Sequence, residues 1–586
     1  MIKEREFFTE SGELVPGFKG IGGFRGPRAS EFTEEQRIIL RYFFTNIDSN
    51  TYCATDNMPS QLWALLLGQY ARSPVTAKER LLQLFEDVHK KDSKNVPSLE
   101  QIAQAINQNE DISSMLQAHY LRSGIFVDEH GVKYGHSSLR DSGTIRICFE
   151  GVSQRATKFL EAAREGAYQE QSTRALPFTV ENLGMPLEVR ETEFEKRFLY
   201  FGEKASKLYS EIQNSAIDYL NFEYAHLREE ANKELNNVTG EKTARLTEGE
   251  WNGVIGAKAF DIARSLLPQY MTTSLGMTLT ARRFQDMLTE WQSSEFEEMR
   301  VLGRAAQIEA MNVMPTLMKH GNPSDFYAQL PQRRRNLNFR FVTSRDIPYE
   351  NLPIKSKLIA STPDLEDLVL ASILFNGSDS SHSLEELKQI VSKLSFEQRR
   401  EIAISQFEGK QSYELVPKTM EIGAVIFERT YDIGAYRDLH RQRGDRQQIA
   451  PYTTFAYHMP GEISKLGGNL ESRFHGVARD AKRLYTDLKS AGMHSVAECV
   501  PIMANLIMHV VTKDPVQCFY EAPLRTQAAG VDSYRLIERQ EIHQLLTLMP
   551  SFKGLVEFDD TPNYPLNRLP EAIKKAIDRV NRKKIK

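Results

Sequence analysis

Two pairs of similar segments occur in the same order along the chain, and this repetition constrains the fold more than any other sequence feature. The segment FEGVSQRATKFLEAAREGAYQEQ, from residue 149, is echoed by FERTYDIGAYRDLHRQRGDRQQ, from residue 427. Downstream, RSLLPQYMTTSLGMTLTARRFQDMLTE (264–290) is echoed by ECVPIMANLIMHVVTKDPVQCFYEAPLR (498–525). Because ordered self-similarity is typical of duplicated units, the sequence predicts one copy over 41–325 and a second, more divergent copy over 335–560.

The residues that flank the two copies differ from them in composition. Residues 1–40 contain the glycine-rich GFKGIGGFRG (17–26), but no strand leads into it and no GK(S/T) follows. An N-terminal arm is therefore favoured over a phosphate loop. Residues 561–586 end in NRKKIK and are expected to form a basic C-terminal helix or tail.

Hydrophobic periodicity predicts a helix-rich α+β fold with a few strands. Apolar residues recur at helical spacing in TAKERLLQLFEDVHK (76–90) and in a long segment over 195–235. Ser98 and Gln101 have the spacing of a capping box at a further helix start. The best strand is TIRICF (144–149), in which apolar residues alternate with others.

Composition excludes several functional classes. A formal net charge of -4 over 586 residues leaves no overall electrostatic footprint for nucleic acid. The four cysteines show no CxxC pattern and the histidines no H-E-x-x-H pattern, so neither disulfides nor a metal site are expected. The N-terminus is too polar for a signal peptide, and the longest apolar run (500–511) is too short to span a bilayer. We therefore expect a cytoplasmic protein with a small-molecule ligand.

The polar stretch REGAYQEQSTR (164–174) is an unusual exit from an apolar helix. If residues 170–174 are extended, Glu170, Ser172 and Arg174 project to one side and present an acceptor, a hydroxyl and a guanidinium to one ligand. A guanidinium binds phosphate bidentately, so the stretch could clamp a nucleotide monophosphate. The alternative is a surface helix end in which Glu170 and Arg174 form an i,i+4 ion pair.

The residues around this stretch are similar to a known family. YGHSSLRDSGTIRICFEGVSQRA followed by AREGAYQEQSTR resembles the signature region of flavin-dependent thymidylate synthases, whose motif is RHRxxSxNxxSxR. DIARSLLPQYMTTSLGMTLTARRFQDMLTE resembles that family's ARxxLP helix pair. The resemblance implies two tandem copies of the family fold, a small antiparallel sheet with helices. It is strong in the first copy and weak in the second.

In the first copy the resemblance covers the second half of the signature. Glu170, Ser172 and Arg174 match the positions that hold deoxyuridylate (dUMP) in the family. Gln169 stands at the asparagine of the motif and is expected to contact the cofactor. The Arg and His of the motif are replaced by alanines at 162–163.

The second copy keeps the complementary half of the signature. His440 and Arg441 match the His-Arg part that the family uses on the flavin. Arg446, Ile449 and Pro451 replace its Asn, Ser and Arg.

Further matches lie outside the signature. Arg264 matches a nucleotide-binding arginine, and Arg282 matches a flavin-contacting arginine. The late arginine that polarises the pyrimidine is replaced by Trp291 in the first copy but kept as Arg525 in the second, so Arg525 is the expected catalytic residue. Of two histidines expected near the start, His136 remains as a cofactor contact.

The resemblance implies a reductive methylation that converts dUMP to dTMP. NADPH would reduce FAD, methylenetetrahydrofolate would supply the carbon, and Arg174 and Arg264 would hold the phosphate. Because family members are homotetramers with sites between subunits, a tandem chain is expected to form a homodimer that acts as a pseudo-tetramer with composite sites. One difficulty is that Arg264 and Arg525 would normally come from the same unit.

Two alternatives stay open at this point. A flavin enzyme on the same scaffold could act on another pyrimidine or on a nucleic-acid base. A catalytically silent, nucleotide-binding scaffold is the other alternative, because neither copy has a full signature.

Overall fold

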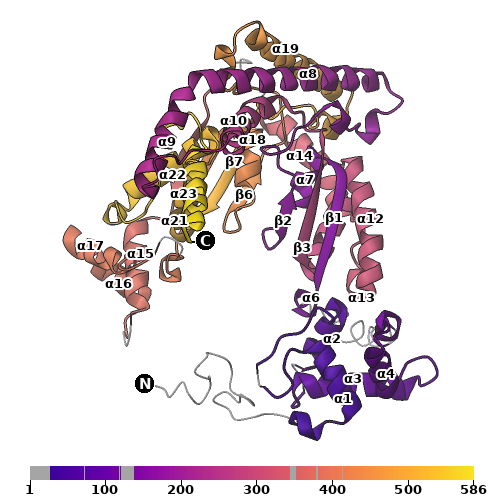
Figure 1. The fold of residues 1–586 in the computed structure, drawn as a ribbon. Coiled ribbons are helices and arrows are strands. Elements are labelled where there is room, and N and C mark those ends of the chain that lie inside the picture. Colours follow the sequence, from indigo (N-terminus) through magenta and orange to yellow (C-terminus); the bar gives the residue numbers. More distant parts are fainter. Residues whose placement is uncertain are drawn as a thin grey trace. The chain divides into compact units, whose positions relative to one another are not determined.

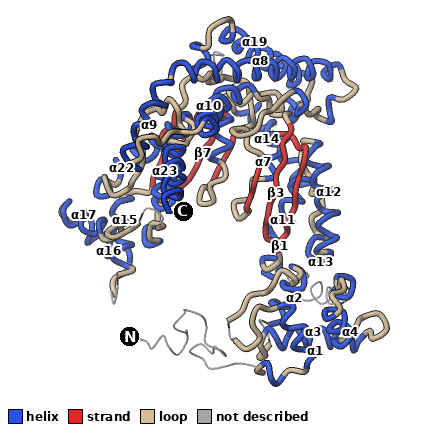
Figure 2. Tube along the Cα trace, viewed as in Figure 1, coloured by secondary structure: helices blue, strands red, loops and turns tan. Residues whose placement is uncertain are grey.

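The computed structural model describes residues 27–49, 51–70, 73–117, 119, 138–343, 352–377, 381–411 and 414–585. The chain forms two compact units. Unit 1 comprises Met1–Cys148, Glu165–Gln169 and Gly276–Arg340, and unit 2 comprises Phe149–Arg164, Glu170–Leu275 and Phe341–Lys586. Helices dominate and the strands form two small sheets, as predicted (Figure 2).

Most of unit 1 is helical. Its amphipathic helices begin where the sequence places their caps: Thr76 and Glu79 form a capping box at the start of α3, and Ser98 and Gln101 form the predicted one at α4. The helices that lie or begin in unit 1 are α1 (Glu34–Phe43), α2 (Ser60–Tyr70), α3 (Ala77–Lys91), α4 (Leu99–Asn107), α6 (Ser138–Asp141), α11 (Ala281–Gln292), α12 (Glu297–Val313), α13 (Pro315–Met318) and α14 (Asp325–Phe341).

A three-stranded sheet in the order β1-β3-β2 contains the predicted strand. Its members are β1 (Thr144–Ser153), β2 (Ala167–Glu170) and β3 (Thr272–Thr280). Cys148 on β1 is exposed although its neighbours in sequence are apolar. Alternation along a strand places it on the face opposite Ile145 and Phe149, which are buried.

Unit 2 contains a second, four-stranded antiparallel sheet in the order β4-β5-β7-β6. Its strands are β4 (Lys355–Ser361), β5 (Val425–Asp432), β6 (Arg446–Ile449) and β7 (Leu506–Lys513). The helices of unit 2 are α7 (Gln154–Leu160), α8 (Glu193–Glu223), α9 (Ala225–Thr239), α10 (Glu248–Ala263), α15 (Leu365–Phe375), α16 (Leu384–Val391), α17 (Phe396–Ile404), α18 (Ile433–Leu439), α19 (Leu470–Ser490), α20 (His494–Ala497), α21 (Pro515–Thr526), α22 (Asp532–Leu548) and α23 (Leu569–Ile585).

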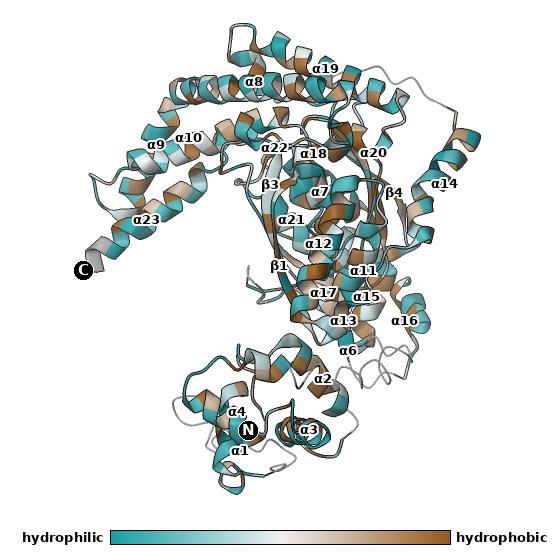
Figure 3. Ribbon diagram, turned by 90° about the vertical axis from the view of Figure 1, so that its right-hand side faces the viewer, coloured by the Kyte–Doolittle hydropathy of each residue, from teal (hydrophilic) through white to brown (hydrophobic). Residues whose placement is uncertain are grey.

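The core of unit 2 lies between this sheet and the helices α15, α21 and α22, where Phe427, Val511 and Leu545 are fully buried. The helices α8 and α19 run side by side (Figure 1). Polar and apolar turns alternate along both helices (Figure 3), as expected of helices that bury one face. The predicted long helix over 195–235 is two helices, because the chain leaves helical geometry at Tyr224.

The same series of elements occurs twice, which confirms the tandem copies. The order β1-α7-β2, then β3-α11-α12, recurs as β5-α18-β6, then β7-α21-α22. The matching helices have equal lengths: 7 residues in α7 and α18, 12 in α11 and α21, and 17 in α12 and α22. The strand orders β1-β3-β2 and β5-β7-β6 also correspond.

Within unit 2 the segments that lead into β3 and β7 pair with each other through equivalent positions. Pro268 forms an antiparallel bridge with Ile502. On either side, Gln269 N donates to Pro501 O at 3.1 Å and Met503 N donates to Leu267 O at 2.9 Å. Because Pro268 pairs with its own counterpart and the two flanking hydrogen bonds join equivalent atoms in opposite directions, a local pseudo-two-fold axis relates the two copies here.

The expected domain boundaries at 41–325 and 335–560 remain predictions, because the compact units divide the chain differently from the repeats. The helix α1 begins at Glu34, inside the expected N-terminal arm, and α23 occupies most of the expected C-terminal tail. The glycine-rich segment 17–26 lies outside the described residues. In the part of the chain that the structure describes, no helix is both long and apolar enough to cross a membrane.

Candidate functional site

The short helices α7 and α18 place the two halves of the signature next to each other. Ser153 Oγ caps α7 by accepting from Ala156 N at 3.0 Å, and Asp432 Oδ1 caps α18 by accepting from Ala435 N at 2.8 Å. Both helices therefore begin immediately after their strands and end seven residues later, at the equivalent residues Glu161 and His440. These two residues meet: His440 Nε2 lies 2.9 Å from Glu161 Oε2.

Around this contact lies a buried group of charges, here called the axial cluster: Lys158, Glu161, Glu170, Arg437 and His440. Lys158 Nζ donates to Glu161 Oε2 at 2.9 Å, and Arg437 Nη2 donates to Glu170 Oε1 at 2.6 Å. Lys158 Nζ also lies 3.7 Å from Glu170 Oε2. None of the five side chains is more than 6% exposed, and two cations face two carboxylates.

Burial and neighbouring charges set the protonation of the axial cluster. Burial alone would raise the pKa of Glu161, but Lys158 and His440 together hold that pKa well below its usual range. Burial lowers the pKa of His440, and the Lys158 ammonium lowers it further. Glu161 is therefore ionised at neutral pH, and its carboxylate opposes the lowering of the His440 pKa.

The two arginines predicted to hold phosphate lie together in a second group, here called the arginine pair with its two aspartates. Arg174 binds Asp261 bidentately, with Nε–Oδ1 and Nη2–Oδ2 distances of 2.6 and 2.8 Å. Arg264 Nη2 donates to Asp438 Oδ2 at 3.1 Å, and its Nη1 donates to Thr173 Oγ1 at 3.4 Å. In this arrangement each guanidinium is already neutralised by a carboxylate.

The pKa values of the two aspartates show that the ion pairs are firm. Burial alone would raise the pKa of Asp438, but Arg264 and Arg174 lower it to about 2. Burial likewise opposes ionisation of Asp261, and Arg174 and Arg264 outweigh it, so the pKa of Asp261 is lowered. Both arginines lower the pKa of both carboxylates, so the four groups form one electrostatic site.

The backbone between the axial cluster and the arginine pair corrects the prediction of an extended run over 170–174. Strand β2 ends at Glu170, and a turn follows in which Ala175 N and Leu176 N both donate to Ser172 O, at 3.1 and 3.0 Å. Ser172 Oγ accepts from Arg174 N at 3.2 Å, which favours the turn over extension. Glu170 pairs with Arg437 and Lys158, and Arg174 pairs with Asp261, so the alternative pair between Glu170 and Arg174 does not form.

Arg525, the expected catalytic residue, lies in the last turn of α21 against the side chain of Gln442. In the amide orientation that satisfies both groups, the Gln442 oxygen accepts from Arg525 Nε and Nη2, each at 2.5 Å. Burial and Asp438 raise the pKa of Tyr534, and both Arg174 and Arg525 oppose that rise. The phenol is therefore close to both arginines, and residues of the two copies converge in unit 2.

Sequence reasoning missed several members of these groups. Arg437 and Asp438 lie in the same turn as the matched His440, and Lys158 lies one helical turn before the unmatched alanines. Charged residues at helical spacing were therefore the available signal. Asp261 precedes the matched Arg264 by three residues. Tyr534 has no local signal, because it reaches the site through the packing of α22.

The expected flavin contacts are divided between the two units. His136 lies outside the described residues, and in unit 1 Gln169 is exposed while Arg282 binds Asp141 at 2.8 Å. In unit 2 Arg441 is exposed, and His440 Nδ1 lies 3.0 Å from Arg437 O. His440 Nε2 lies at ion-pair distance from Glu161 but makes no hydrogen bond to a described residue. The flavin roles of these residues stay predictions.

A cavity of about 540 Å³ adjoins the arginine pair within unit 2. Arg264 and Asp261 form part of its wall, together with Asp432, Lys258 and Lys465. This volume is within the usual range of small-molecule sites. A ligand in this cavity would therefore meet Arg264 and Asp261, and Arg174 is linked to the cavity through Asp261.

The position equivalent to Arg264 in the second copy is different. It is Glu498, which binds the guanidinium of Arg155, and Arg155 is itself the equivalent of Gly434. That guanidinium also lies 4.4 Å from the ring centroid of Tyr452. We call this group, Arg155, Tyr452 and Glu498, the mirrored pocket, and its space is filled by protein side chains.

Comparison with known proteins agrees with the family resemblance. The model of the family described as thymidylate synthase complementing protein matches residues 90–316. A UPF0159 protein of Chlamydia muridarum is 24% identical over 569 residues, covering 93% of this chain and 98% of its own length. A UPF0159 protein of Thermoplasma acidophilum is 23% identical over 484 residues, covering 78% of this chain and 93% of its own.

Among solved structures, the UMP/dUMP methylase PolB from Streptomyces cacaoi, bound with 5-Br dUMP, is 15% identical. It covers 35% of this chain and 96% of its own length, with a TM-score of 0.27. The family match includes β1, α7, β2, the turn that carries Arg174, and the Arg264 element. The part of this chain that matches the model of the thymidylate synthase complementing protein family is residues 90–316.

Proposed function

We propose that the chain is a thymidylate synthase-like enzyme that methylates dUMP to dTMP with methylenetetrahydrofolate and NADPH through FAD. The observation that carries the proposal is the convergence of Arg174 and Arg264 from the first copy with Asp438 and Tyr534 from the second. Arg264 and Asp261 of this group line one cavity. The site is thus composite within one chain, and we propose that two chains associate as a homodimer.

Phosphate binding requires a rearrangement of the arginine pair. The two arginines and two aspartates balance each other, so a phosphate dianion would bring two uncompensated charges into a buried site. Phosphate offers a guanidinium the same bidentate geometry as a carboxylate but twice the charge. We propose that the ligand phosphate takes the place of Asp261 on Arg174, and that the released carboxylate turns toward the cavity that Asp261 lines.

The other residues have positional and electrostatic roles in this proposal. Arg525, held by Gln442, stabilises negative charge that develops on the pyrimidine carbonyl. Glu170 is fixed by Arg437 and Lys158, so its carboxyl group is held in a set direction. Reduced FAD would supply a hydride equivalent when bound.

The same ion pairs favour a second candidate function. A site whose arginines are both neutralised by the protein's own carboxylates resembles a closed form, which suits a catalytically silent scaffold that binds nucleotide weakly or under particular conditions. A different pyrimidine monophosphate would fit the site of the first proposal equally well, because the arginine pair recognises the phosphate and not the base.

The deciding experiment uses the purified chain. We expect flavin absorption near 450 nm and dUMP binding in titration calorimetry. We also expect dTMP to form from dUMP when methylenetetrahydrofolate and NADPH are present. Arg174→Gln should abolish dUMP binding, whereas Arg473→Gln, which removes an exposed pair with Glu211, should not. Protein that binds dUMP without flavin and without turnover would support the scaffold. Binding of neither flavin nor any pyrimidine monophosphate would refute both candidates.

A further inference from the structure

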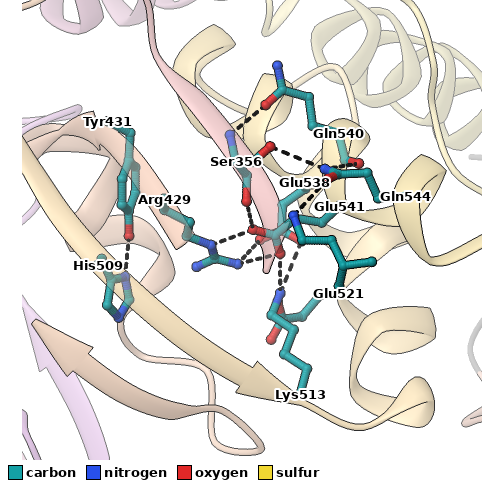
Figure 4. A network of polar contacts seen from close by, with 11 residues as sticks. Ser356, Arg429, Tyr431, His509, Lys513, Glu521, Glu538, Gln540, Glu541 and Gln544 are labelled. Carbon is teal, nitrogen blue, oxygen red and sulfur yellow. Dashed lines mark hydrogen bonds and ion pairs between the residues drawn. The ribbon is translucent and has the colours of Figure 1, made fainter. Parts of the chain in front are cut away.

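A buried network of charges underlies the sheet of unit 2, and its carboxyls outnumber its cations (Figure 4). The cations are Arg429 on β5 and Lys513 on β7. The carboxyls are Asp445, Glu521, Glu538 and Glu541, and all six residues are at most 2% exposed. If every carboxyl were ionised, the network would carry two uncompensated negative charges in the protein interior. Such charges are expensive, so the network must hold protons.

Hydrogen bonding shows which carboxyl stays ionised. Glu541 accepts from Arg429 Nε and Nη2, at 2.6 and 2.8 Å, from Lys513 Nζ at 3.0 Å and from Ser356 Oγ at 2.6 Å. Burial alone would raise the pKa of Glu541, but Arg429 and Lys513 lower it to about 2. Glu541 therefore has the most donors, although Arg429 Nη2 also donates to Glu538 at 3.1 Å and Lys513 Nζ also donates to Glu521.

Asp445 and Glu521 are neighbouring buried carboxyls, and the pair requires a shared proton. Asp445 follows Gly444, whose backbone lies against Gln517, and Gln517 Nε2 donates to Glu521. The Asp445 carboxyl also raises the pKa of Glu521, so the two carboxyls face each other in the same network. Among the described residues, no N–H or O–H donor reaches either oxygen of Asp445. Two ionised carboxylates would repel each other, whereas one proton between them makes a charge-assisted hydrogen bond.

The groups that face Asp445 come from every element packed around it. They are Arg429 on β5, Lys513 on β7, Cys518 and Glu521 on α21, and Glu538 on α22. Burial raises the pKa of Asp445, and burial together with Asp445 raises the pKa of Glu521 to about 7. The cations lower both values but do not cancel the rise.

Asp445 ends the loop that joins α18 to β6, residues 441–445, and this loop touches Arg525. Gln442 accepts from the Arg525 guanidinium, as described above. At Gly444 the backbone lies against Gln517, so close that a Cβ would be 2.0 Å from Gln517 Oε1. Gln517 Nε2 in turn donates to Glu521. The loop is therefore attached to α21 through Gln442, Gly444 and Asp445 in succession.

We propose that Asp445 is a proton-dependent positioning residue, which fastens the loop 441–445 onto Glu521 and so sets the position of Arg525. When the shared proton leaves, repulsion between the two carboxylates releases the loop, and Gln442 no longer holds Arg525. The fastening rests on the fold alone, and only its consequence for Arg525 rests on the proposed function.

Limited trypsin digestion of the full chain tests the fastening without flavin or nucleotide. Arg441, Arg443 and Arg446 in and beside the loop are exposed cleavage sites. We expect the ratio of wild-type cleavage to Asp445→Asn cleavage, each measured at the same pH, to rise roughly fourfold from pH 6.5 to 8.5. Opening of the loop releases a proton only while the closed form still holds one, so the ratio stops rising once the closed form has lost its proton. Comparison within each pH removes the pH dependence of trypsin.

Asn at 445 imitates the protonated carboxyl, so Asp445→Asn should keep the loop closed at every pH. Asp480→Asn, which removes an exposed carboxylate on α19, should behave as wild type. Glu541→Gln should move the rise in cleavage to lower pH, because it frees Arg429 and Lys513 to lower the pKa of Asp445 and Glu521. A wild-type ratio that does not change with pH, or an equal rise in Asp445→Asn, would overturn the proposal.

If the loop sets the position of Arg525 during turnover, Asp445→Asn should flatten the alkaline limb of the plot of kcat against pH and leave kcat at pH 6.5 unchanged. If an active Asp445→Asn enzyme keeps the wild-type alkaline limb, the loop does not set the position of Arg525. Absence of turnover in every variant, with the expected cleavage pattern, would count against the proposed function and not against the fastening.

Discussion

The arginine pair and the mirrored pocket occupy equivalent places about the pseudo-two-fold axis, yet only one of them is suited to an anionic ligand. In the first, Arg264 and Arg174 lie beside a cavity of about 540 Å³. In the second, Glu498 stands at the equivalent of Arg264 and binds Arg155, which also lies over Tyr452. Duplication therefore preserved the backbone frame while the charges at matching positions diverged, and we infer one ligand site per chain.

The buried cores of the copies diverged in the same way. Lys513, Glu521 and Glu541 occupy the positions in their elements that Leu279, Met287 and Ala306 occupy in the first copy. The three apolar residues are buried, so an apolar core and an ionic network occupy equivalent places. The ionic version is the one that can respond to pH, since apolar side chains bind no protons.

The largest effect is expected from removing one network cation. Arg429→Met leaves four buried carboxyls with Lys513 alone and should lower the free energy of unfolding by about 3–5 kcal/mol. Denaturant unfolding measures this, with Arg473→Met on the surface of unit 2 as the control. A loss below about 1 kcal/mol, as for surface pairs, would show that the network is hydrated and unlike the buried core of the first copy.

The pH dependence of stability should separate the two kinds of carboxyl. Burial raises the pKa of Glu521 to about 7, so its contribution is complete below its unfolded pKa and is lost as pH rises through about 7. Glu521→Gln should remove up to about 1.4 kcal/mol per pH unit of this decline between pH 5 and 7. Thermal or urea unfolding across this range measures it.

Asp438 should show the opposite pH dependence. Its pKa is lowered to about 2, so its stabilisation is present above its unfolded pKa and is lost as pH falls toward 2. Asp438→Asn should therefore flatten the stability curve only at acid pH. Identical curves for Glu521→Gln and Asp438→Asn would contradict the assigned protonation states.

The fold was largely predictable from sequence, and the site only in part. Segment echoes around 149 and 427 identified the duplication because strand and helix periodicity survive divergence, and the Ser98–Gln101 capping box is a local signal. The pairing of Glu161 with His440 could not be foreseen, since it depends on a pseudo-two-fold contact between segments 279 residues apart. The bend after Ser172 was missed because a hydroxyl–backbone hydrogen bond competes with extension.

An intermediate effect is expected from exchanging the arginine in only one of the two pockets. Arg264→Lys keeps the charge but loses the planar fork, so dUMP affinity should fall roughly 10- to 100-fold. Arg155→Lys in the mirrored pocket should leave dUMP affinity unchanged. Titration calorimetry measures both and should give one dUMP per wild-type chain. Two sites per chain, or equal losses in both variants, would contradict the difference between the pockets.

The smallest effect is expected where the copies meet at the surface through α8 and α19. Lys204 Nζ lies 2.6 Å from Asp480 Oδ2, and both side chains are more than a quarter exposed. Water screens such a pair, and ordering two long side chains costs entropy, so Lys204→Ala should lower the free energy of unfolding by about 0.2–1 kcal/mol. The double variant with Asp480→Ala should lose little more than either single variant, which denaturant unfolding can measure.

A coupling energy above about 2 kcal/mol would mean that the copies are joined by surface ion pairs as firmly as by the buried axial cluster. The expected small value leaves the buried contacts at the pseudo-two-fold axis as the stronger connection between the two copies.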